Sequence, residues 1–273
     1  MIVDEGVCRL LAAREGLPMD FVAKEFYLMQ LLKGLSDLGA LDSMIFKGGT
    51  ALNKIYIKEG YRFSEDLDFD FTGKSWPELF KVVTTKISGF EALEARRIIG
   101  DRVAQVDFLY KTEWGKKDRV RLDVNTRPYT KTVDPIQMRE AMPQFTGSGV
   151  SSVQVYGIDD LLSRKMSALK DRAEGKDIFD VSNALGLADK KKLLKAIALI
   201  ATGKGGAKEF LSETVKKVEG ADYKRLRKLT NPYIPLKNRP PDWKILADTL
   251  IMKLQMLMEE AGNTRRVRSA ERP

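Results

Sequence analysis

The sequence contains no histidine. This absence excludes Ser-His-Asp and Cys-His catalytic groups, zinc sites with histidine ligands, and proton transfer by an imidazole. Any catalysis by this chain must therefore use carboxylates, lysine, arginine, hydroxyl groups or a hard metal ion. That chemistry is typical of phosphoryl and nucleotidyl transfer.

Cysteine and long apolar runs are also scarce. The one cysteine, Cys8, cannot form a disulfide within the chain and lies in a helical apolar pattern, so we interpret it as a small core residue. No run of about eighteen apolar residues occurs, which argues against a membrane span. The N-terminus lacks the basic and then apolar pattern of a signal peptide. We expect a cytoplasmic protein without membrane contact.

Positive charge is present in excess but is unevenly distributed. The 273 residues carry a net charge of +9, and residues 151–273 account for it, with 25 Lys and Arg against 16 Asp and Glu. The first 150 residues are therefore neutral. Such an excess favours a polyanionic partner, a nucleic acid, on the second half of the chain. The alternative interpretation is a solvated helical surface rich in lysine.

Apolar spacing predicts an α+β protein with two domains. The first, 1–150, is expected to be a mixed β-sheet flanked by helices. The second, 151–273, is expected to be a basic helical domain, with a disordered tail at 262–273. In the first domain we expect helices at 2–15, 20–39, 51–56 and 75–88 and strands at 44–46, 66–71, 102–110 and 119–125. Residues 126–157 resemble a connector with one short strand at 152–156, and further helices are expected from 159 and at 188–201, 205–219 and 241–261.

A glycine pair with a hydroxyl residue follows the first predicted strand. Gly48, Gly49 and Thr50 stand between a short apolar run and a helical pattern. A tight glycine turn at the start of a helix directs backbone N–H groups and the positive end of the helix dipole at an anion. Thr50 is expected to cap the helix or to donate to a phosphate oxygen; an ordinary turn is the alternative.

Carboxylates alternate along the strand at 66–71. Asp66, Asp68 and Asp70 share one face, and their mutual repulsion is relieved if a cation binds. A pair of divalent metal ions needs carboxylates spaced in this way. We assign Asp66 and Asp68 to the site and leave Asp70, at the far end of the strand, outside it. A polar face on an edge strand is the alternative.

A third carboxylate is expected from a neighbouring strand. Asp123 has core residues on both sides, since Leu122 and Val124 are expected to face inward. Asp107 has similar neighbours and is a rival. We favour Asp123 as the residue that joins Asp66 and Asp68.

Four sequence blocks in order resemble one family. FKGGTAL, RFSEDLDF, RLDV and RKMSALKDRAEGKDIFDV, within residues 20–185, resemble the AbiEii/AbiGii nucleotidyltransferase-like toxins, which have the polymerase-β-like nucleotidyltransferase fold. The resemblance implies that 1–150 is a nucleotidyltransferase-like catalytic domain and that the helical domain 151–273 completes the active site. It implies NTP-dependent transfer with a divalent metal, Mg²⁺ or Mn²⁺. It also implies the toxin of a type IV toxin–antitoxin or phage-defence pair, with a possible cognate antitoxin. Some relatives add nucleotides to tRNA.

The resemblance also implies site residues. Gly49 and Thr50 match the glycine–hydroxyl motif, and the run from Arg62 and Ser64 to Asp66 and Asp68 matches the metal-binding motif. Later in the chain, Lys165 and Asp177 match the lysine and aspartate of the family's helical motif. Lys176 stands where the family usually has an arginine before that aspartate.

The chemistry of these residue types suggests their roles. Asp66 and Asp68 are expected to be metal ligands, and Asp123 is expected either to hold the metal that activates the acceptor hydroxyl or to act as the base for that hydroxyl. Lys165 is expected to contact the phosphates as a point charge, with Arg62 as a bidentate alternative and Ser64 as a hydrogen-bond donor. Asp177 either orients Lys165 or helps to activate the acceptor, and Asp180 is its rival.

The leading hypothesis is therefore a magnesium-dependent nucleotidyltransferase that transfers a nucleotide from an NTP to an RNA acceptor, tRNA above all, as a toxin. One alternative is a nucleotidyltransferase that modifies a protein or a small molecule. Another is an RNA-binding regulator that kept the fold without catalysis.

Overall fold

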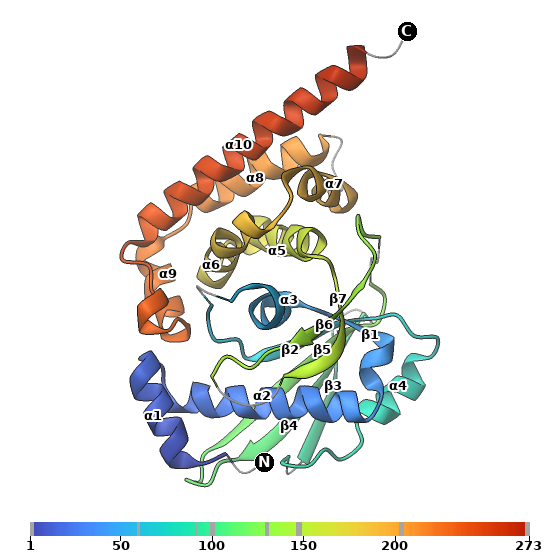
Figure 1. Cartoon of the computed structure of the whole chain (residues 1–273), viewed down its shortest axis with the longest axis vertical. Helices are drawn as coiled ribbons and strands as arrows, with labels where there is room; N and C mark the ends of the chain where they lie inside the picture. The colour runs from blue at the N-terminus through green and yellow to red at the C-terminus, as the bar shows by residue number, and fades with distance from the viewer. Residues whose placement is uncertain are drawn as a thin grey trace. The chain divides into compact units, whose positions relative to one another are not determined.

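The computed structural model in Figure 1 describes residues 3–58, 61–90, 92–98, 102–128, 131–145, 149–201 and 205–270. The chain forms two compact units. Unit 1 comprises Met1–Thr130, Ile136–Tyr156 and Pro232–Asn238, and unit 2 comprises Lys131–Pro135, Gly157–Asn231 and Arg239–Pro273. The boundary expected from the sequence, at residue 150, lies close to Tyr156, where the chain passes from unit 1 to unit 2. Two short segments do not follow this division: Lys131–Pro135 belongs to unit 2, and Pro232–Asn238 belongs to unit 1.

Unit 1 is built on a mixed seven-stranded sheet with the order β3-β4-β5-β2-β1-β7-β6. β2 is parallel to β5 and β1 is parallel to β7, while the other neighbours are antiparallel. The strands are β1 (Met44–Lys47), β2 (Asp66–Phe71), β3 (Ala92–Ile98), β4 (Val103–Lys111), β5 (Lys117–Asn125), β6 (Gln137–Ala141) and β7 (Val150–Val155). The helical segments are α1 (Glu5–Glu15), α2 (Met19–Asp37), α3 (Gly48–Ala51), α4 (Trp76–Val83), a 3-10 turn at Ala40–Ser43 and a π-helical turn at Leu52–Tyr56.

The two faces of this sheet differ in chemistry. Alternation along β2 and β5 directs Leu67, Phe69, Leu122 and Val124 to one face, where all four are buried. α2 crosses this apolar face (Figure 1), and its Tyr27 ring stacks on Tyr110 of β4 with centroids 3.8 Å apart. The opposite face of the same strands carries the aspartates.

Unit 2 is helical. α5 (Ile158–Arg172) and α8 (Gly206–Glu219) pack on each other, and α10 (Trp243–Ala270) lies along α8 (Figure 1). The remaining helices are α6 (Gly175–Ala184), α7 (Lys190–Ile200) and α9 (Tyr223–Thr230). The core is formed by apolar residues at helical spacing, such as Leu162, Met166 and Leu169 of α5.

The α+β prediction is confirmed, and several local predictions need correction. The connector at 126–157 contains β6 as well as the expected strand, because β6 pairs with β7 in a short hairpin. α2 starts at Met19 after Pro18, so Asp20 lies in its first turn instead of capping it. The tail was expected to be disordered, whereas α10 continues to Ala270; residues 271–273 lie outside the described part.

Candidate active site

The polar face of the sheet brings together carboxylates from β2 and β5. In the parallel register, Asp68 lies beside Asp123, and Asp66 lies beside Arg121. These two cross-strand rows, one through Asp68 and Asp123 and one through Asp66 and Arg121, continue onto β4. There Gln105 pairs with Asp123, and Asp107 pairs with Arg121. Two adjacent rows of this face therefore contain both expected carboxylates of β2 and the one expected from β5.

Burial and like charge act on these carboxyl groups. The pKa of Asp66 is raised by burial and by the charges of Glu65 and Asp123. The pKa of Asp123 is also raised, chiefly by burial, although a hydrogen bond of 2.7 Å from the Gln105 amide opposes this rise. This face would thus be stabilised by an added positive charge.

The donor chemistry of this face fits a hard divalent cation. Mg²⁺ and Mn²⁺ prefer carboxylate oxygens, and Asp66, Asp68 and Asp123 supply them from one half-buried surface. Among the described residues, however, no three acidic side chains converge closely enough to form a ready-made metal site. Their side chains would have to rearrange for all three to bind one ion.

The two other aspartates of this face are engaged in structural ion pairs. Asp107 is fully buried and lies 3.0 Å from Arg121 Nε and 3.4 Å from Arg119 Nε. Asp70 pairs with Lys47 and accepts a hydrogen bond of 2.6 Å from the Tyr156 hydroxyl. These partners explain why Asp107, the sequence rival of Asp123, is the weaker candidate.

Gly48 is required by the close approach of β2. Its φ is +74°, in the left-handed region that favours glycine, and it directly follows β1. A Cβ atom at this position would lie 2.2 Å from Asp68 Oδ2. The turn and the Asp68 carboxylate are therefore in direct contact, and no other residue type fits there without a shift.

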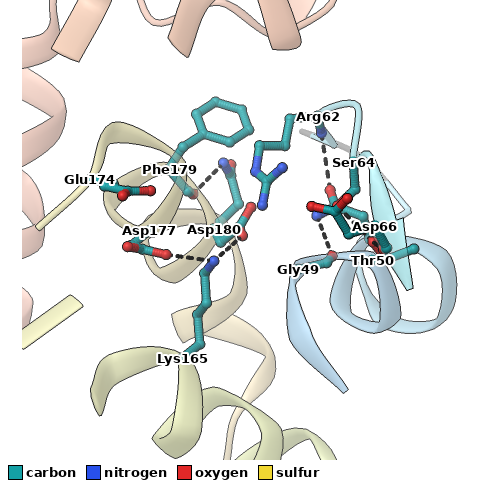
Figure 2. Close-up of polar contacts among 12 residues, drawn as sticks. Gly49, Thr50, Arg62, Ser64, Asp66, Lys165, Glu174, Asp177, Phe179 and Asp180 are labelled. Atoms are coloured by element: carbon teal, nitrogen blue, oxygen red, sulfur yellow. Dashed lines mark hydrogen bonds and ion pairs between the residues drawn. The ribbon is translucent and has the colours of Figure 1, made fainter. Parts of the chain in front are cut away.

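Thr50 and Ser64 connect this turn to the start of β2 (Figure 2). The Thr50 hydroxyl donates to the Asp66 carbonyl oxygen at 2.5 Å and lies 2.7 Å from Ser64 Oγ. Thr50 has one hydroxyl proton and a carbonyl oxygen can only accept, so Ser64 is the donor in the second contact. Both protons are used internally, and Thr50 does not cap α3. Phosphate binding by either hydroxyl would require these bonds to rearrange.

Arg62 is buried beside the same turn. Its backbone N–H donates to Asn53 Oδ1 at 3.0 Å, and its guanidinium donates to the Phe63 carbonyl oxygen at 2.9 Å. Asn53 in turn donates to the Gly49 carbonyl oxygen at 2.8 Å. This chain of contacts links Arg62 to the glycine turn.

In unit 2, Lys165 lies between two buried carboxylates (Figure 2). Its Nζ is 2.7 Å from Asp177 Oδ1 and 2.8 Å from Asp180 Oδ2, and both aspartates are fully buried. Arg172 adds two hydrogen bonds to Asp177, of 2.7 and 3.0 Å. Burial acts to raise the pKa of Asp177, but Arg172 and Lys165 outweigh it, and the pKa lies below its usual value. Both Asp177 and Asp180 thus hold Lys165.

Sequence reasoning overlooked three residues of these networks. Arg121, Gln105 and Arg172 contact the aspartates but were given no role. Arg121 could have been found from the sequence, since it precedes Asp123 by two residues and therefore shares its face of the strand. Gln105 has none, because the register between β4 and β5 is a tertiary feature.

The mixed sheet with its glycine turn and paired aspartates is typical of nucleotidyltransferase-like proteins. Two solved structures share this fold: JHP933 from Helicobacter pylori, 22% identical with a TM-score of 0.62 over 93% of this chain and 98% of that one, and the nucleotidyltransferase toxin MenT4 from Mycobacterium tuberculosis H37Rv, 19% identical with a TM-score of 0.62 over 92% and 89%. No curated protein matches the chain.

The family itself is identified by the sequence. The family model described as nucleotidyl transferase AbiEii toxin, type IV TA system, matches residues 30–266. The chain belongs to this family and is a nucleotidyltransferase. Within the described residues, no helix is both long and apolar enough to cross a membrane.

Proposed function

We propose that this nucleotidyltransferase transfers a nucleotide from an NTP to an RNA acceptor, tRNA above all, in a reaction that depends on Mg²⁺ or Mn²⁺. The observation that supports it is the half-buried polar face of the sheet, where Asp68 and Asp123 are neighbours beside Asp66 and the Gly48 turn. The protein acts in the cytoplasm as the toxin of a toxin–antitoxin or phage-defence pair, with a cognate antitoxin, as its family suggests.

The carboxylates of unit 1 have distinct roles in this proposal. Asp66, Asp68 and Asp123 would hold the divalent metal, which would supply positive charge to the triphosphate. Asp123 also accepts the proton of the acceptor hydroxyl. Gln105 orients the Asp123 carboxylate through its hydrogen bond.

The remaining residues bind the nucleotide. Backbone N–H groups at Gly48, Gly49 and Thr50 contact phosphate oxygens, and Arg62 and Ser64 donate to the same group after rearrangement. Lys165 contributes a positive charge to the phosphates, and Asp177 keeps it in position through the ion pair of 2.7 Å.

The choice of an RNA acceptor is supported by charge. The entire net charge of +9 comes from residues 151–273, and phosphate groups are the partners that such a surface attracts. A protein or small-molecule acceptor on the same active site would make no use of this excess.

The test is a labelling experiment. The purified protein is incubated with total cellular RNA, Mg²⁺ and each α-labelled NTP in turn, and the label is followed in RNA, in protein and in small molecules. We expect label in RNA, lost on addition of EDTA and in Asp66→Asn and Asp123→Asn. Asp37→Asn, at an exposed position on α2, is the matched control.

The three fractions separate the candidate functions. Label in protein or in a soluble product would replace the RNA acceptor while retaining the enzyme. If no NTP labels any fraction, and calorimetry detects no metal-dependent NTP binding, the protein is a non-catalytic RNA-binding regulator instead.

A further inference from the structure

A pocket of about 570 Å³ lies in unit 1 next to Asp66. It forms where β5 is longer than its neighbour: β2 begins at Asp66, opposite Arg121, whereas β5 begins four residues earlier, at Lys117. Residues 117–120 of β5 therefore have no β2 residue beside them. The pocket walls include Lys117, Arg119 and Arg121 of this strand.

Some of the charges that line the pocket are already paired. Lys24 of α2 lies 3.0 Å from Asp118 and 3.9 Å from Glu65, so one lysine stands between two carboxylates. Arg121 is held by Asp107 at 3.0 Å. These pairs leave two further cations of the pocket wall to consider, Lys117 and Arg119.

Glu65, Asp66 and Asp118 also line the pocket, and among its described cations Lys117 and Arg119 are the two least engaged by carboxylates. Lys117 is exposed and makes no ion pair with any described residue. Arg119 is 43% exposed, and within the described part of the chain its ion-pair partner is Asp107 at 3.4 Å, a carboxylate that already binds Arg121. The pocket thus presents an ammonium and a guanidinium group to an anion.

The charge along this face of β5 changes sign between the pocket and the carboxylates. Lys117, Arg119, Arg121 and Asp123 alternate along one face of β5, so the charge changes from positive to negative towards Asp123. With about 3.3 Å per residue, Arg119 lies roughly 13 Å from Asp123. The Gly48 turn belongs to the opposite flank, because β1 pairs with the other edge of β2. An anion at Arg119 is therefore separate from one at the glycine turn.

We propose that this pocket, through Lys117 and Arg119, binds the phosphodiester backbone of the RNA acceptor next to its 3′ end. The inference rests on the proposed function, in which the terminal hydroxyl of the acceptor reaches Asp123. A strand that ends at Asp123 and extends along β5 brings its last phosphates over the cationic end. A guanidinium binds such phosphates through two parallel hydrogen bonds.

RNA binding is measured first, without chemistry. The probe is a fluorescein-labelled oligouridylate of about twelve nucleotides, within the usual site size of single-strand binders. Fluorescence anisotropy gives its Kd with Mg²⁺ and without NTP at several salt concentrations. For Lys117→Gln and Arg119→Gln we expect a Kd about three- to tenfold higher. The slope of log Kd against the logarithm of the salt concentration should fall by about 0.7 for each phosphate that the variant no longer neutralises. Lys81→Gln and Arg9→Gln, at exposed helical positions of unit 1, should match the wild type.

Steady-state transfer then separates the acceptor from the nucleotide. The two pocket variants should raise the KM for RNA and leave the KM for NTP unchanged. A raised KM for NTP, or an RNA affinity equal to that of the control variants, overturns the inference. Lys117→Gln removes no partner of another described residue and keeps this test valid if Arg119→Gln folds poorly.

The proposed function can fail independently. If no NTP is transferred to RNA, the function is wrong, while the anisotropy experiment still decides whether the pocket binds RNA. If transfer to RNA occurs and the pocket variants bind RNA normally, only the present inference is lost.

Discussion

At the residue scale, the least exposed charges of unit 2 depend on one another. Asp177 has two cationic partners, Lys165 and Arg172, and no exposed surface. Removing one member of such a buried group leaves the others uncompensated, which costs more than an exposed ion pair contributes. These aspartates therefore matter for stability as well as for the proposed chemistry.

Asp177→Asn tests this dependence through pH. The folded-state pKa of Asp177 lies below its usual value, so its contribution to stability is present above about pH 4 and is lost as the pH falls through the folded value. We expect the variant to be about 3 kcal/mol less stable at pH 7, with a smaller difference at acid pH. Urea denaturation at several pH values measures both.

The control for this experiment is Asp171→Asn. Asp171 is 65% exposed and pairs with Lys170 at 3.3 Å, so its replacement should cost less than about 1 kcal/mol. A stability difference for Asp177→Asn that stays constant down to the lowest pH would contradict the assigned charge state.

At the element scale, the turn between β1 and α3 is defined by backbone geometry. Gly48 combines a positive φ with direct contact to Asp68, and Thr50 and Ser64 attach the following turn to the first residue of β2. The π-helical turn at Leu52–Tyr56 continues from it, a feature often found near functional sites. The position of the Asp68 carboxylate is thus coupled to the conformation of this turn.

Gly48→Ala should disturb both features at once. A left-handed backbone at a non-glycine residue costs roughly 1–2 kcal/mol, and the new methyl group would displace the Asp68 carboxylate. We expect transfer to fall at least tenfold, with a small decrease in the melting temperature. The comparison is Gly186→Ala in unit 2, where a Cβ meets no atom within 4 Å. Equal activities of the two variants would show that the turn does not position Asp68.

At the scale of the whole molecule, the residues that the sequence assigns to the site belong to two units. Asp66, Asp68 and Asp123 belong to unit 1, whereas Lys165 and Asp177 belong to unit 2. Residues that act in one transition state show non-additive effects on the rate, while residues that act independently show additive ones.

A double-mutant cycle tests this convergence. Lys165→Arg keeps the charge that Asp177 and Asp180 require but changes the geometry of the donor, and we combine it with Asp123→Asn. If the two residues act together, the double variant should transfer nucleotides about as slowly as the slower single variant in single-turnover assays. Lys170→Arg, on the same helix, is the control. Fully additive losses would mean that Lys165 supports only the fold of unit 2.

The sequence by itself determined the fold class, the family and the alternation of aspartates. Period-two patterns fixed which side chains share a face of β2 and of β5, because side-chain direction in a strand is a local property. Four motifs in order were enough for the family, and the nucleotidyltransferase assignment is confirmed. The absence of histidine limited the possible chemistry, because composition alone decides which catalytic groups a chain can supply.

Only the tertiary structure decided which residues are neighbours. Strand register, a long-range feature, put Asp123 beside Asp68 and engaged Asp107 with two arginines. The hydrogen bonds of the Thr50 and Ser64 hydroxyls within the protein were also not predicted, since hydrogen-bond partners far apart in sequence cannot be deduced from local pattern. The pocket beside Asp66 depends on β5 being longer than β2 at one end, which a strand prediction cannot give because strand boundaries are set by pairing.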